Sequence, residues 1–353
     1  MFGDCLVTKP LLILDQYFRT VEELFDPDTY DELSSICRIE GGQDQPMDIE
    51  RVSALLKEAT FLVAARPRVT QADIQSAPNL RAVIEVSGAF NDGIDYAACF
   101  ERGIDVLSCA PGFREAVAEM GLAMLLSASR GLVAEHEAFR QGGESWLDDR
   151  EETDFTVYRQ QIGFIGYGNI AREMHALLRP FAPKISAYDP WLTTFPQDVS
   201  PLGLDDIFKQ CRAIIVAAVP DADNRHMIGA KQIDAMQTGS ALILISRAHV
   251  LDFDVAVQAA SAGRITFATD VFPSEPADKD HPIRTAPNVI LSPHRAAAVP
   301  RGRQLIGRMI LHDVKSVLNG DTRRQLVPAN PSRVEGLIAA QRAIEKSGKL
   351  DAT

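Results

Sequence analysis

The sequence is poor in cysteine, in long apolar runs and in positive charge. Its five cysteines are an odd number, are widely spaced and include no CxxC pair, so neither a disulfide framework nor a zinc site is indicated: Cys5, Cys37, Cys99, Cys109 and Cys211. No stretch approaches the ~18 consecutive apolar residues of a membrane-spanning helix, and no basic segment followed by a long apolar one stands at the start. These absences predict a reduced, soluble protein of the cytoplasm with no metal and no membrane partner.

The shortage of positive charge excludes another class of partner. Lysine and arginine number 36 against 48 aspartates and glutamates, which gives a net charge of −12. Nucleic-acid binding needs a basic face that neutralises phosphates, so no nucleic-acid partner is expected. The length of 353 residues is large for one hydrophobic core, because single cores stop growing at about 250 to 300 residues, and two domains are therefore expected.

Short apolar runs alternate with helical patterns along most of the chain. The expected strands are Leu11–Asp15, Phe61–Ala65, Ala82–Val86, Val106–Leu107, Ala213–Val219, Ala241–Ile245, Thr266–Ala268 and Val289–Leu291. The expected helices include 94–102, 114–130, 204–210, 252–262 and 300–319, whereas 141–156 is expected to be a loop. The last ~20 residues are either a helix that covers a surface or joins a dimer, or a solvated tail. Strands that alternate with helices predict parallel, doubly wound α/β sheets.

The stretch Ile162–Pro190 carries the most specific pattern. It reads IGFIGYGNIAREMHALLRPFAPKISAYDP, which is an apolar strand, a glycine turn at Gly166 and Gly168, a helical segment and a second strand. Glycines at a strand-to-helix turn permit a tight bend and let a pyrophosphate approach the backbone, and the helix N-terminus attracts its negative charge. The third position of the pattern is Ala171, which is small enough to keep the helix close to the strand.

An acidic residue ends the second strand of this stretch. Asp189 follows Gly168 by about 20 residues, the separation at which a carboxylate accepts a hydrogen bond from the ribose 2′-hydroxyl of a dinucleotide. A 2′-phosphate would be repelled by this carboxylate, and no arginine follows it closely. NAD is therefore expected as the cofactor in preference to NADP.

Three side chains suited to acid–base chemistry follow later strands. Arg247 comes after ALILIS, Glu275 follows the TFAT run by a few residues, and His294 comes after VILSP. In an open parallel sheet, ligands bind beyond the carboxyl ends of the strands. Arginine can clamp a carboxylate and polarise a carbonyl, and a histidine oriented by a carboxylate can exchange a hydroxyl proton. Together these residues suit hydride transfer between a 2-hydroxy acid and a nicotinamide ring.

From about Phe61 to Val327 the chain resembles the D-isomer-specific 2-hydroxyacid dehydrogenases, a family that includes phosphoglycerate, glycerate and hydroxypyruvate-type enzymes. The resemblance is carried by segments in the family's order, namely APNLRAVIEVSG, IDYAACFERGIDV, PG followed by AVAE, GFIGYGNIA, AYDP, NRHMIGA, SRAHVLD, TDVFPSEP and PNVILSPH. It implies an NAD-dependent oxidoreductase that transfers a hydride between nicotinamide and C2 of a D-2-hydroxy acid or 2-oxo acid.

The resemblance also assigns roles to residues. It implies Arg247 as the substrate-binding and polarising residue, His294 as the acid/base and Glu275 as its partner. On the cofactor side it implies the turn glycines, backbone N–H groups of the helix start, a ribose ligand and two contacts on the nicotinamide side: Gly166, Gly168, Asn169, Ile170, Asp189, Ile245 and Asp270. In relatives, backbone groups of the loop equivalent to Gly88 and Ala89 receive the substrate carboxylate.

The fold that the resemblance implies consists of two Rossmann-like, doubly wound parallel-sheet domains. The NAD-binding domain, 111–298, is inserted into a discontinuous substrate-binding (catalytic) domain, 1–110 and 299–353. Relatives are usually homodimers, so a homodimer is expected.

The sequence departs from the family's pattern close to these residues. Ala248 stands where a glycine commonly follows the arginine, and Leu244 stands where an asparagine is common. Two other functions remain open on the same scaffold, namely phosphite oxidation and an NAD(H)-sensing binding protein with little turnover. Glu275 disfavours the formate-oxidising form, which has a glutamine there. The substrate side chain is expected against the first-domain loop, near Ala65, Arg66, Ser87 and Phe90.

Overall fold

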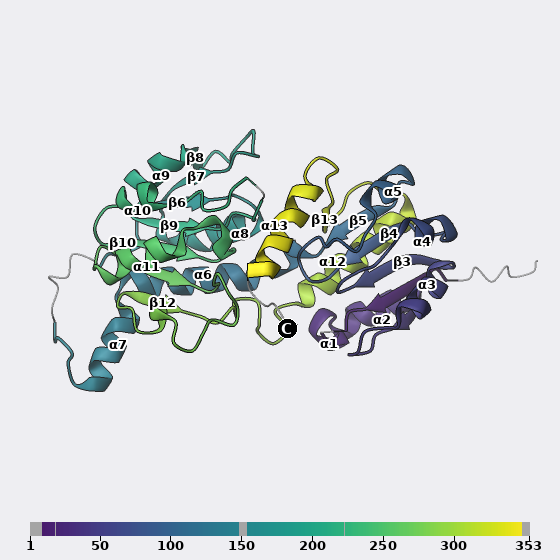
Figure 1. The fold of residues 1–353 in the computed structure, drawn as a ribbon, viewed down its shortest axis with the longest axis horizontal. Coiled ribbons are helices and arrows are strands. Elements are labelled where there is room, and N and C mark those ends of the chain that lie inside the picture. Colours follow the sequence, from purple (N-terminus) through teal and green to yellow (C-terminus); the bar gives the residue numbers. More distant parts are fainter. Residues whose placement is uncertain (1–8, 18, 148–153, 222, 348–353) are drawn as a thin grey trace, which may run out of the picture. The chain divides into compact units, whose positions relative to one another are not determined.

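The computed structural model describes residues 9–17, 19–147, 154–221 and 223–347. The chain forms two compact units, the first from Met1–Phe113 and Val299–Gln341, the second from Arg114–Ala298 and Arg342–Asp351. The ends of the expected domain ranges 1–110 and 299–353, part of the expected loop 141–156, and Cys5 lie outside the described residues. Each unit is an α/β unit built on a parallel sheet, which confirms the predicted fold class (Figure 1).

The first unit is built on a six-stranded sheet. Its strands are β1 (Leu11–Asp15), β2 (Arg38–Gly41), β3 (Ala59–Ala64), β4 (Ala82–Glu85), β5 (Asp105–Ser108) and β13 (Val327–Pro328), in the spatial order β13-β5-β4-β3-β1-β2. All neighbours are parallel except β13, which pairs antiparallel with β5. Its helices are α1 (Val21–Leu24), α2 (Pro27–Ile36), α3 (Ile49–Leu56), α4 (Gln71–Ser76), α5 (Tyr96–Glu101), the short η1 (Ala110–Phe113), α12 (Gln304–Asn319) and the part of α13 (Val334–Ser347) up to Gln341.

Apolar residues on both faces of these strands explain why helices cover both faces. In β1, Leu11 and Ile13 join a core with residues of α3, α4 and α5. Leu12 and Leu14, which point the other way because side chains alternate along a strand, join a second core with residues of α1, α2 and α12. The run LLILD has no polar alternation, as expected for a strand buried on both sides.

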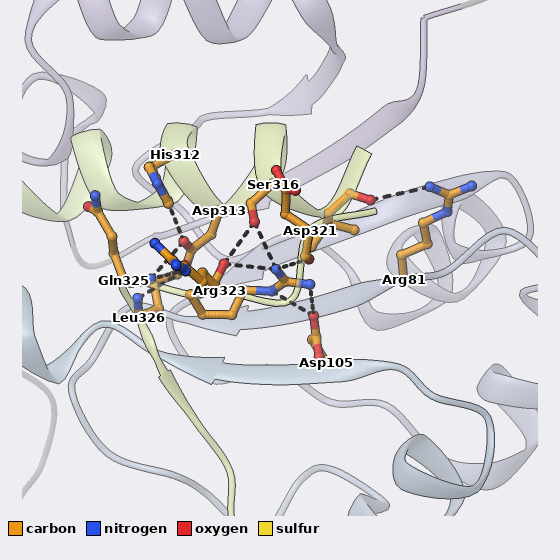
Figure 2. A network of polar contacts seen from close by, with 11 residues as sticks. Arg81, Asp105, His312, Asp313, Ser316, Asp321, Arg323, Gln325 and Leu326 are labelled. Atoms are coloured by element: carbon orange, nitrogen blue, oxygen red, sulfur yellow. Dashed lines mark hydrogen bonds and ion pairs between the residues drawn. The ribbon is translucent and has the colours of Figure 1, made fainter. Parts of the chain in front are cut away.

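A buried carboxylate on α12 is hydrogen-bonded to the residues that directly precede β13. Asp313 on α12 is fully buried, and its oxygens accept the backbone N–H groups of Gln325 and Leu326. Figure 2 shows Asp313 with Gln325 and Leu326. The neighbouring Arg324 pairs with Asp105 of β5, with 2.7 Å between Nη2 and Oδ2. These contacts hold the segment before β13 beside β5.

The second unit is built on a seven-stranded, wholly parallel sheet. Its strands are β6 (Gln161–Ile165), β7 (Lys184–Tyr188), β8 (Val199–Pro201), β9 (Ala213–Val216), β10 (Ser240–Leu244), β11 (Ile265–Thr269) and β12 (Val289–Leu291). Its helices are α6 (Arg114–Ser129), α7 (Leu132–Gln141), α8 (Asn169–Leu178), α9 (Leu204–Gln210), α10 (Ala230–Asp234) and α11 (Phe253–Ser261), with the short turns η2 (Arg179–Phe181), η3 (Ala248–Val250) and η4 (Pro282–Arg284).

The strand order of this sheet, β12-β11-β10-β9-β6-β7-β8, reverses direction between β6 and β9. The chain runs outward from β6 through β7 to β8, and then returns to β9 and continues to β12 on the other side. Open α/β sheets bind ligands outside the carboxyl ends of the strands at such a reversal. The segments after β6 and β9 are therefore the place to look for a bound cofactor.

Helix α7 was not predicted from the sequence. It projects away from the seven-stranded sheet of its unit, and none of its residues is buried (Figure 1). A helix that packs no stripe against the core leaves no periodic apolar signal, which explains the omission. Gly131, in the left-handed conformation with φ +56°, separates it from α6.

In the described part of the chain, no single helix is long and apolar enough to cross a membrane. Only Ala110–Ser129 taken together with Leu132–Gln141, a pair bent by 60°, meets that test of length and composition. The four described cysteines, Cys37, Cys99, Cys109 and Cys211, are free thiols.

Candidate active site

The glycine turn after β6 has the shape that a dinucleotide needs. Gly166 has φ +81°, and a Cβ at this position would lie 2.6 Å from the backbone of Ala218, which follows β9. Only glycine allows this close approach. At Gly168, by contrast, a Cβ would meet nothing within 4 Å, so open space lies beside the backbone just before α8 begins.

The start of α8, together with the turn at Gly166 and Gly168, forms the expected pyrophosphate site, the cofactor cradle. Asn169 and Ile170 are its first two helical residues, and the N–H groups of a first helical turn have no partner within the helix. Ala171, the third position of the pattern, is fully buried. Open space at Gly168 together with a helix N-terminus fits the pyrophosphate of a dinucleotide.

Asp189 lies directly beside this turn. Its Oδ2 accepts the backbone N–H of Tyr167 at 2.9 Å, and its Oδ1 accepts the N–H of Trp191 at 2.9 Å. Each carboxylate oxygen has two lone pairs, so one acceptor site remains on each oxygen. The carboxylate is thus held in one orientation and can still accept hydrogen bonds from a ribose.

The structure brings the predicted acid–base residues together. Arg247, Glu275 and His294 follow β10, β11 and β12, which are neighbours in the sheet. His294 Nδ1 lies 2.5 Å from Glu275 Oε2. Glu275 Oε1 accepts the N–H of Phe272 at 2.9 Å, so both oxygens of this carboxylate are engaged. The histidine side chain is 39% exposed and the glutamate 18%, which leaves the imidazole accessible while its partner is shielded.

The charges of this group explain two pKa shifts. Burial disfavours the charge on Glu275, but the hydrogen bond and positive charge of His294, the Phe272 N–H and the charge of Arg247 outweigh it, and its pKa is lowered. Burial lowers the pKa of Arg247, and the nearby carboxylates of Glu275 and Asp270 oppose that effect. Arg247 is therefore a cation held close to the His294–Glu275 pair, with its Nη1 donating to Ser246 O at 2.8 Å.

Asp270 has a structural role that the sequence did not reveal. Its buried carboxylate accepts the hydroxyl of Ser292 and the N–H groups of Arg295 and Ala296, and its carbonyl accepts the N–H of His294 at 2.8 Å. His294 has φ +52°, which is uncommon for a residue with a side chain. Asp270 is thus hydrogen-bonded to the loop on both sides of His294.

Two predicted cofactor contacts have buried side chains. Asp270 is 2% exposed and Ile245 is 4% exposed. Ile245 packs where α6 comes close to the sheet, since a Cβ on Gly121 would lie 3.1 Å from its Cδ1. Their assignment to the nicotinamide side stays a prediction.

The predicted substrate loop belongs to the first unit, after β4. Gly88 has φ +93°, and its N–H donates to Glu85 Oε2 at 2.9 Å. Glu85 is completely buried and also accepts the N–H and hydroxyl of Ser87 and the hydroxyl of Ser108. Burial raises the pKa of Glu85 although these hydrogen bonds oppose it.

Glu85 was missed at the level of the sequence, although a signal was present. It is a charged residue within the apolar run AVIEV, where an unpaired charge would be costly. Because Glu85 holds the Gly88 N–H, the predicted contact of Gly88 with a substrate carboxylate stays a prediction. In the part of the chain that the structure describes, the Ala89 N–H has no acceptor.

No three His, Cys, Asp or Glu side chains among the described residues lie close enough together to hold a metal ion.

Comparisons with known proteins show what the chain is similar to. Residues 122–296 match the family model described as D-isomer specific 2-hydroxyacid dehydrogenase, NAD binding domain, which makes NAD(H) the cofactor. The chain is 30% identical over 287 residues to a D-3-phosphoglycerate dehydrogenase of Methanocaldococcus jannaschii, covering 79% of this chain and 53% of the relative. It is 25% identical over 264 residues to a hydroxypyruvate reductase of Thermotoga maritima, covering 74% of this chain and 85% of the relative.

The match to solved structures covers nearly the whole molecule. A phosphoglycerate oxidoreductase from Rhizobium etli has a TM-score of 0.80 and 30% identity, covering 91% of this chain and 99% of that one. This chain spans about half the length of the phosphoglycerate dehydrogenases it matches, with 53%, 58% and 48% of three such relatives aligned. Sequence motifs, site geometry and these comparisons converge on one conclusion, that the chain belongs to the D-isomer-specific 2-hydroxyacid dehydrogenase family.

Proposed function

We propose that this protein catalyses reversible hydride transfer between NAD(H) and C2 of a D-2-hydroxy acid or 2-oxo acid. The observation that carries the proposal is the His294–Glu275 pair, 2.5 Å apart, with Arg247 on the neighbouring strand. The bound cofactor supplies or accepts the hydride. This chemistry requires two things of the protein. One is a histidine that a carboxylate holds in the correct orientation, and the other is an arginine that can polarise a carbonyl.

In the direction of reduction, His294 donates a proton to the carbonyl oxygen of the 2-oxo acid. Oε2 of Glu275 accepts a hydrogen bond from Nδ1–H of His294, so Nε2 is the ring atom left to exchange a proton with the substrate oxygen. Arg247 stabilises the negative charge that develops on that oxygen and binds the substrate carboxylate. In the reverse direction His294 accepts the hydroxyl proton.

The proposal extends to the cofactor and substrate contacts. Gly166, Gly168, Asn169 and Ile170 would cradle the pyrophosphate, and Asp189 would accept the hydroxyls of the adenosine ribose. The carboxylate of Asp189 and the absence of a nearby basic residue in the sequence favour NAD over NADP. On the first unit, we assign the substrate carboxylate to backbone groups of Gly88 and Ala89, with the Ala89 N–H as the donor that is not already held.

NADH oxidation against a panel of 2-oxo acids tests the activity. The panel contains glyoxylate, hydroxypyruvate, its phosphate ester and larger acids of differing charge. We expect turnover with at least one member, and a loss of about 10²- to 10⁴-fold in kcat for His294→Gln with NADH affinity retained. His312→Gln, which changes a half-exposed histidine of α12, is the matched control. NADH binding without turnover across the panel would instead identify an NAD(H)-sensing protein.

We also propose that the protein is a homodimer held through α7. This helix carries large apolar side chains that are mostly exposed, with Leu132 and Phe139 each 59% exposed, and Trp146 follows at 77%. Phe139 and Trp146 pack against one another with ring centroids 6.2 Å apart. An exposed apolar patch of this kind marks an interaction surface, and a second copy of the chain fits it because like surfaces bury each other around a two-fold axis.

Light scattering coupled to size-exclusion chromatography tests the dimer. We expect twice the mass of 38.6 kDa for the unmodified chain and a shift toward monomer for Phe139→Ser. A monomer at micromolar concentration would refute the dimer while leaving the proposed activity untouched.

A further inference from the structure

The second residue of the glycine turn, Tyr167, is turned into the protein. Its side chain is 1% exposed, although the next residue, Gly168, is exposed. Phe164 and Phe195 contact its ring, with centroids 5.9 Å and 6.1 Å away. The guanidinium of Arg172 lies over the same ring at 5.1 Å. Nothing in the chemistry of hydride transfer requires a phenol at this place.

The phenol hydroxyl of Tyr167 is hydrogen-bonded to a buried histidine. Tyr167 Oη lies 2.6 Å from Nδ1 of His175, which is in the last turn of α8 and is 6% exposed. Burial raises the pKa of Tyr167, so the phenol keeps its proton and donates it. Nδ1 must then be the acceptor, which places the proton of the neutral imidazole on Nε2.

The other nitrogen faces an acidic group. His175 Nε2 lies 3.5 Å from Oδ2 of Asp198, just before β8, and the same oxygen lies 3.7 Å from Nη2 of Arg179. Burial lowers the pKa of His175, the charge of Asp198 opposes that effect, and Arg179 adds to it. The imidazole is therefore neutral at neutral pH. Among the residues that the structure describes, Asp198, Arg179 and Arg172 are the charged groups that face this pair.

The backbone of Tyr167 connects this pair to the cofactor cradle. Its N–H donates to Asp189 Oδ2 at 2.9 Å, and this peptide lies between Gly166 and Gly168. A turn with glycines on both sides has little stiffness of its own, because glycine loses more conformational freedom on ordering than any other residue. The buried side chain of Tyr167 restrains the backbone of the turn, which the two glycines alone would leave flexible.

We propose that Tyr167 and His175 are positioning residues for NAD(H): their hydrogen bond holds the glycine turn and Asp189 in the arrangement that receives the adenosine half of the cofactor. The inference rests on NAD(H) as the cofactor, and not on the identity of the substrate. It adds a role for two side chains that are buried next to the turn.

The arrangement makes the cradle sensitive to pH. When His175 gains a proton, Nδ1 can no longer accept from Tyr167. If the phenol oxygen becomes the acceptor instead, its own hydrogen loses its partner inside the protein, at a cost on the scale of a lost buried hydrogen bond. Neutral His175 thus favours the ordered turn, and affinity for the cofactor falls as the pH drops.

Calorimetric binding of ADP-ribose tests the inference, because this probe contains the adenosine ribose and pyrophosphate but lacks the nicotinamide. For the unmodified protein, we expect the Kd to rise by about 3- to 10-fold as the pH falls from 8 through the lowered pKa of His175, a change that corresponds to one net hydrogen bond. Tyr167→Phe removes only the hydroxyl, and we expect it to bind about 3- to 10-fold more weakly at pH 8 and to lose the pH dependence.

Two further variants separate positioning from general damage. His175→Gln keeps an acceptor but gains no charge, so we expect near-normal affinity at pH 8 and no weakening as the pH falls. Tyr158→Phe changes a tyrosine of the same unit that is 56% exposed and should behave as the unmodified protein. If Tyr167→Phe does not fold, the unmodified protein and His175→Gln still decide the question.

A Tyr167→Phe variant whose Kd at pH 8 lies within twofold of that of the unmodified protein would overturn the inference. So would a His175→Gln variant whose Kd rises with falling pH as it does in the unmodified protein. Because the readout is binding and not turnover, an absence of activity toward every 2-oxo acid would contradict the proposed function and leave this result standing.

Discussion

The imidazole Nδ1 of His294 lies 2.5 Å from Oε2 of Glu275, although the two residues are separated by 19 positions and follow different strands. The partner of His294 is itself held, because the N–H of Phe272 donates to its other oxygen at 2.9 Å. The ring therefore has one orientation before any substrate arrives. Catalytic groups held in place in this way need little rearrangement during the reaction.

Replacing Glu275 by Gln should lower kcat/KM by about 10- to 100-fold, since a hydrogen bond to a charged group contributes about 1.5 to 3 kcal/mol. The pKa of Glu275 is lowered in the folded protein, so its contribution to stability is present above its ordinary pKa of 4.5 and is lost as the pH falls through the lowered value. Rates and thermal unfolding at pH 7 and below pH 4.5 check both parts. Unchanged rates in Glu275→Gln would show that the pair is only structural.

The strands, the glycine turn and the acid–base trio were predictable from the sequence because each leaves a local pattern. Buried parallel strands are continuous apolar runs, and the residue after each run lies at the ligand-binding edge. The hydrogen bonds between Asp270 and the loop of His294 leave no such pattern in the sequence. The partners of Asp270 are mostly backbone N–H groups, which only folding brings near to its carboxylate. The same holds for Tyr167 and His175, whose contact depends on which way one side chain of the turn points.

The two turn glycines should respond differently to the same substitution. Gly166→Ala places a Cβ 2.6 Å from the backbone of Ala218 at φ +81°, so both stability and NADH binding should be lost. Gly168→Ala meets nothing within 4 Å and has φ −83°, so the protein should fold normally. The added methyl group would occupy the space beside the pyrophosphate, and NADH binding should weaken by about 10-fold or more, on the scale of a lost charge-assisted hydrogen bond.

Circular dichroism melts and NADH fluorescence titrations of both variants check this pair. Gly168→Ala is the informative member, because its effect on binding cannot be attributed to unfolding if its melting temperature is normal. Normal NADH affinity in Gly168→Ala would mean that the cofactor does not approach the backbone at this turn.

Asp270→Asn should weaken the loop that carries His294. An asparagine can keep its oxygen toward Ser292 and Arg295, but its NH₂ group would then face the N–H of Ala296. The cost of one unsatisfied buried group is about 1 to 3 kcal/mol. We expect a drop in melting temperature of roughly 2 to 10 °C, and a fall in kcat larger than the change in the Kd for NADH.

The matched control for that experiment is Asp254→Asn, which changes an exposed aspartate in the first turn of α11. Asp254→Asn should leave the melting temperature and kcat unchanged. A selective loss of NADH affinity in Asp270→Asn, with kcat at saturating NADH preserved, would instead support the direct nicotinamide contact that the family resemblance implies.

Glu85 should make the first unit less stable as the pH rises. Its pKa is raised by burial, so its contribution to stability is fully present below the ordinary pKa of 4.5 and is lost as the pH rises through the raised value. Glu85→Gln can keep the hydrogen bonds, because the amide oxygen can accept from Ser87 and Gly88 while the NH₂ group donates to the hydroxyl of Ser108. Urea unfolding should show the variant to be more stable at pH 8 than the unmodified protein, on the order of 1 kcal/mol. This advantage should shrink or reverse at pH 4.5, and a variant less stable than the unmodified protein at pH 8 would show that Glu85 is ionised and well solvated by its four donors.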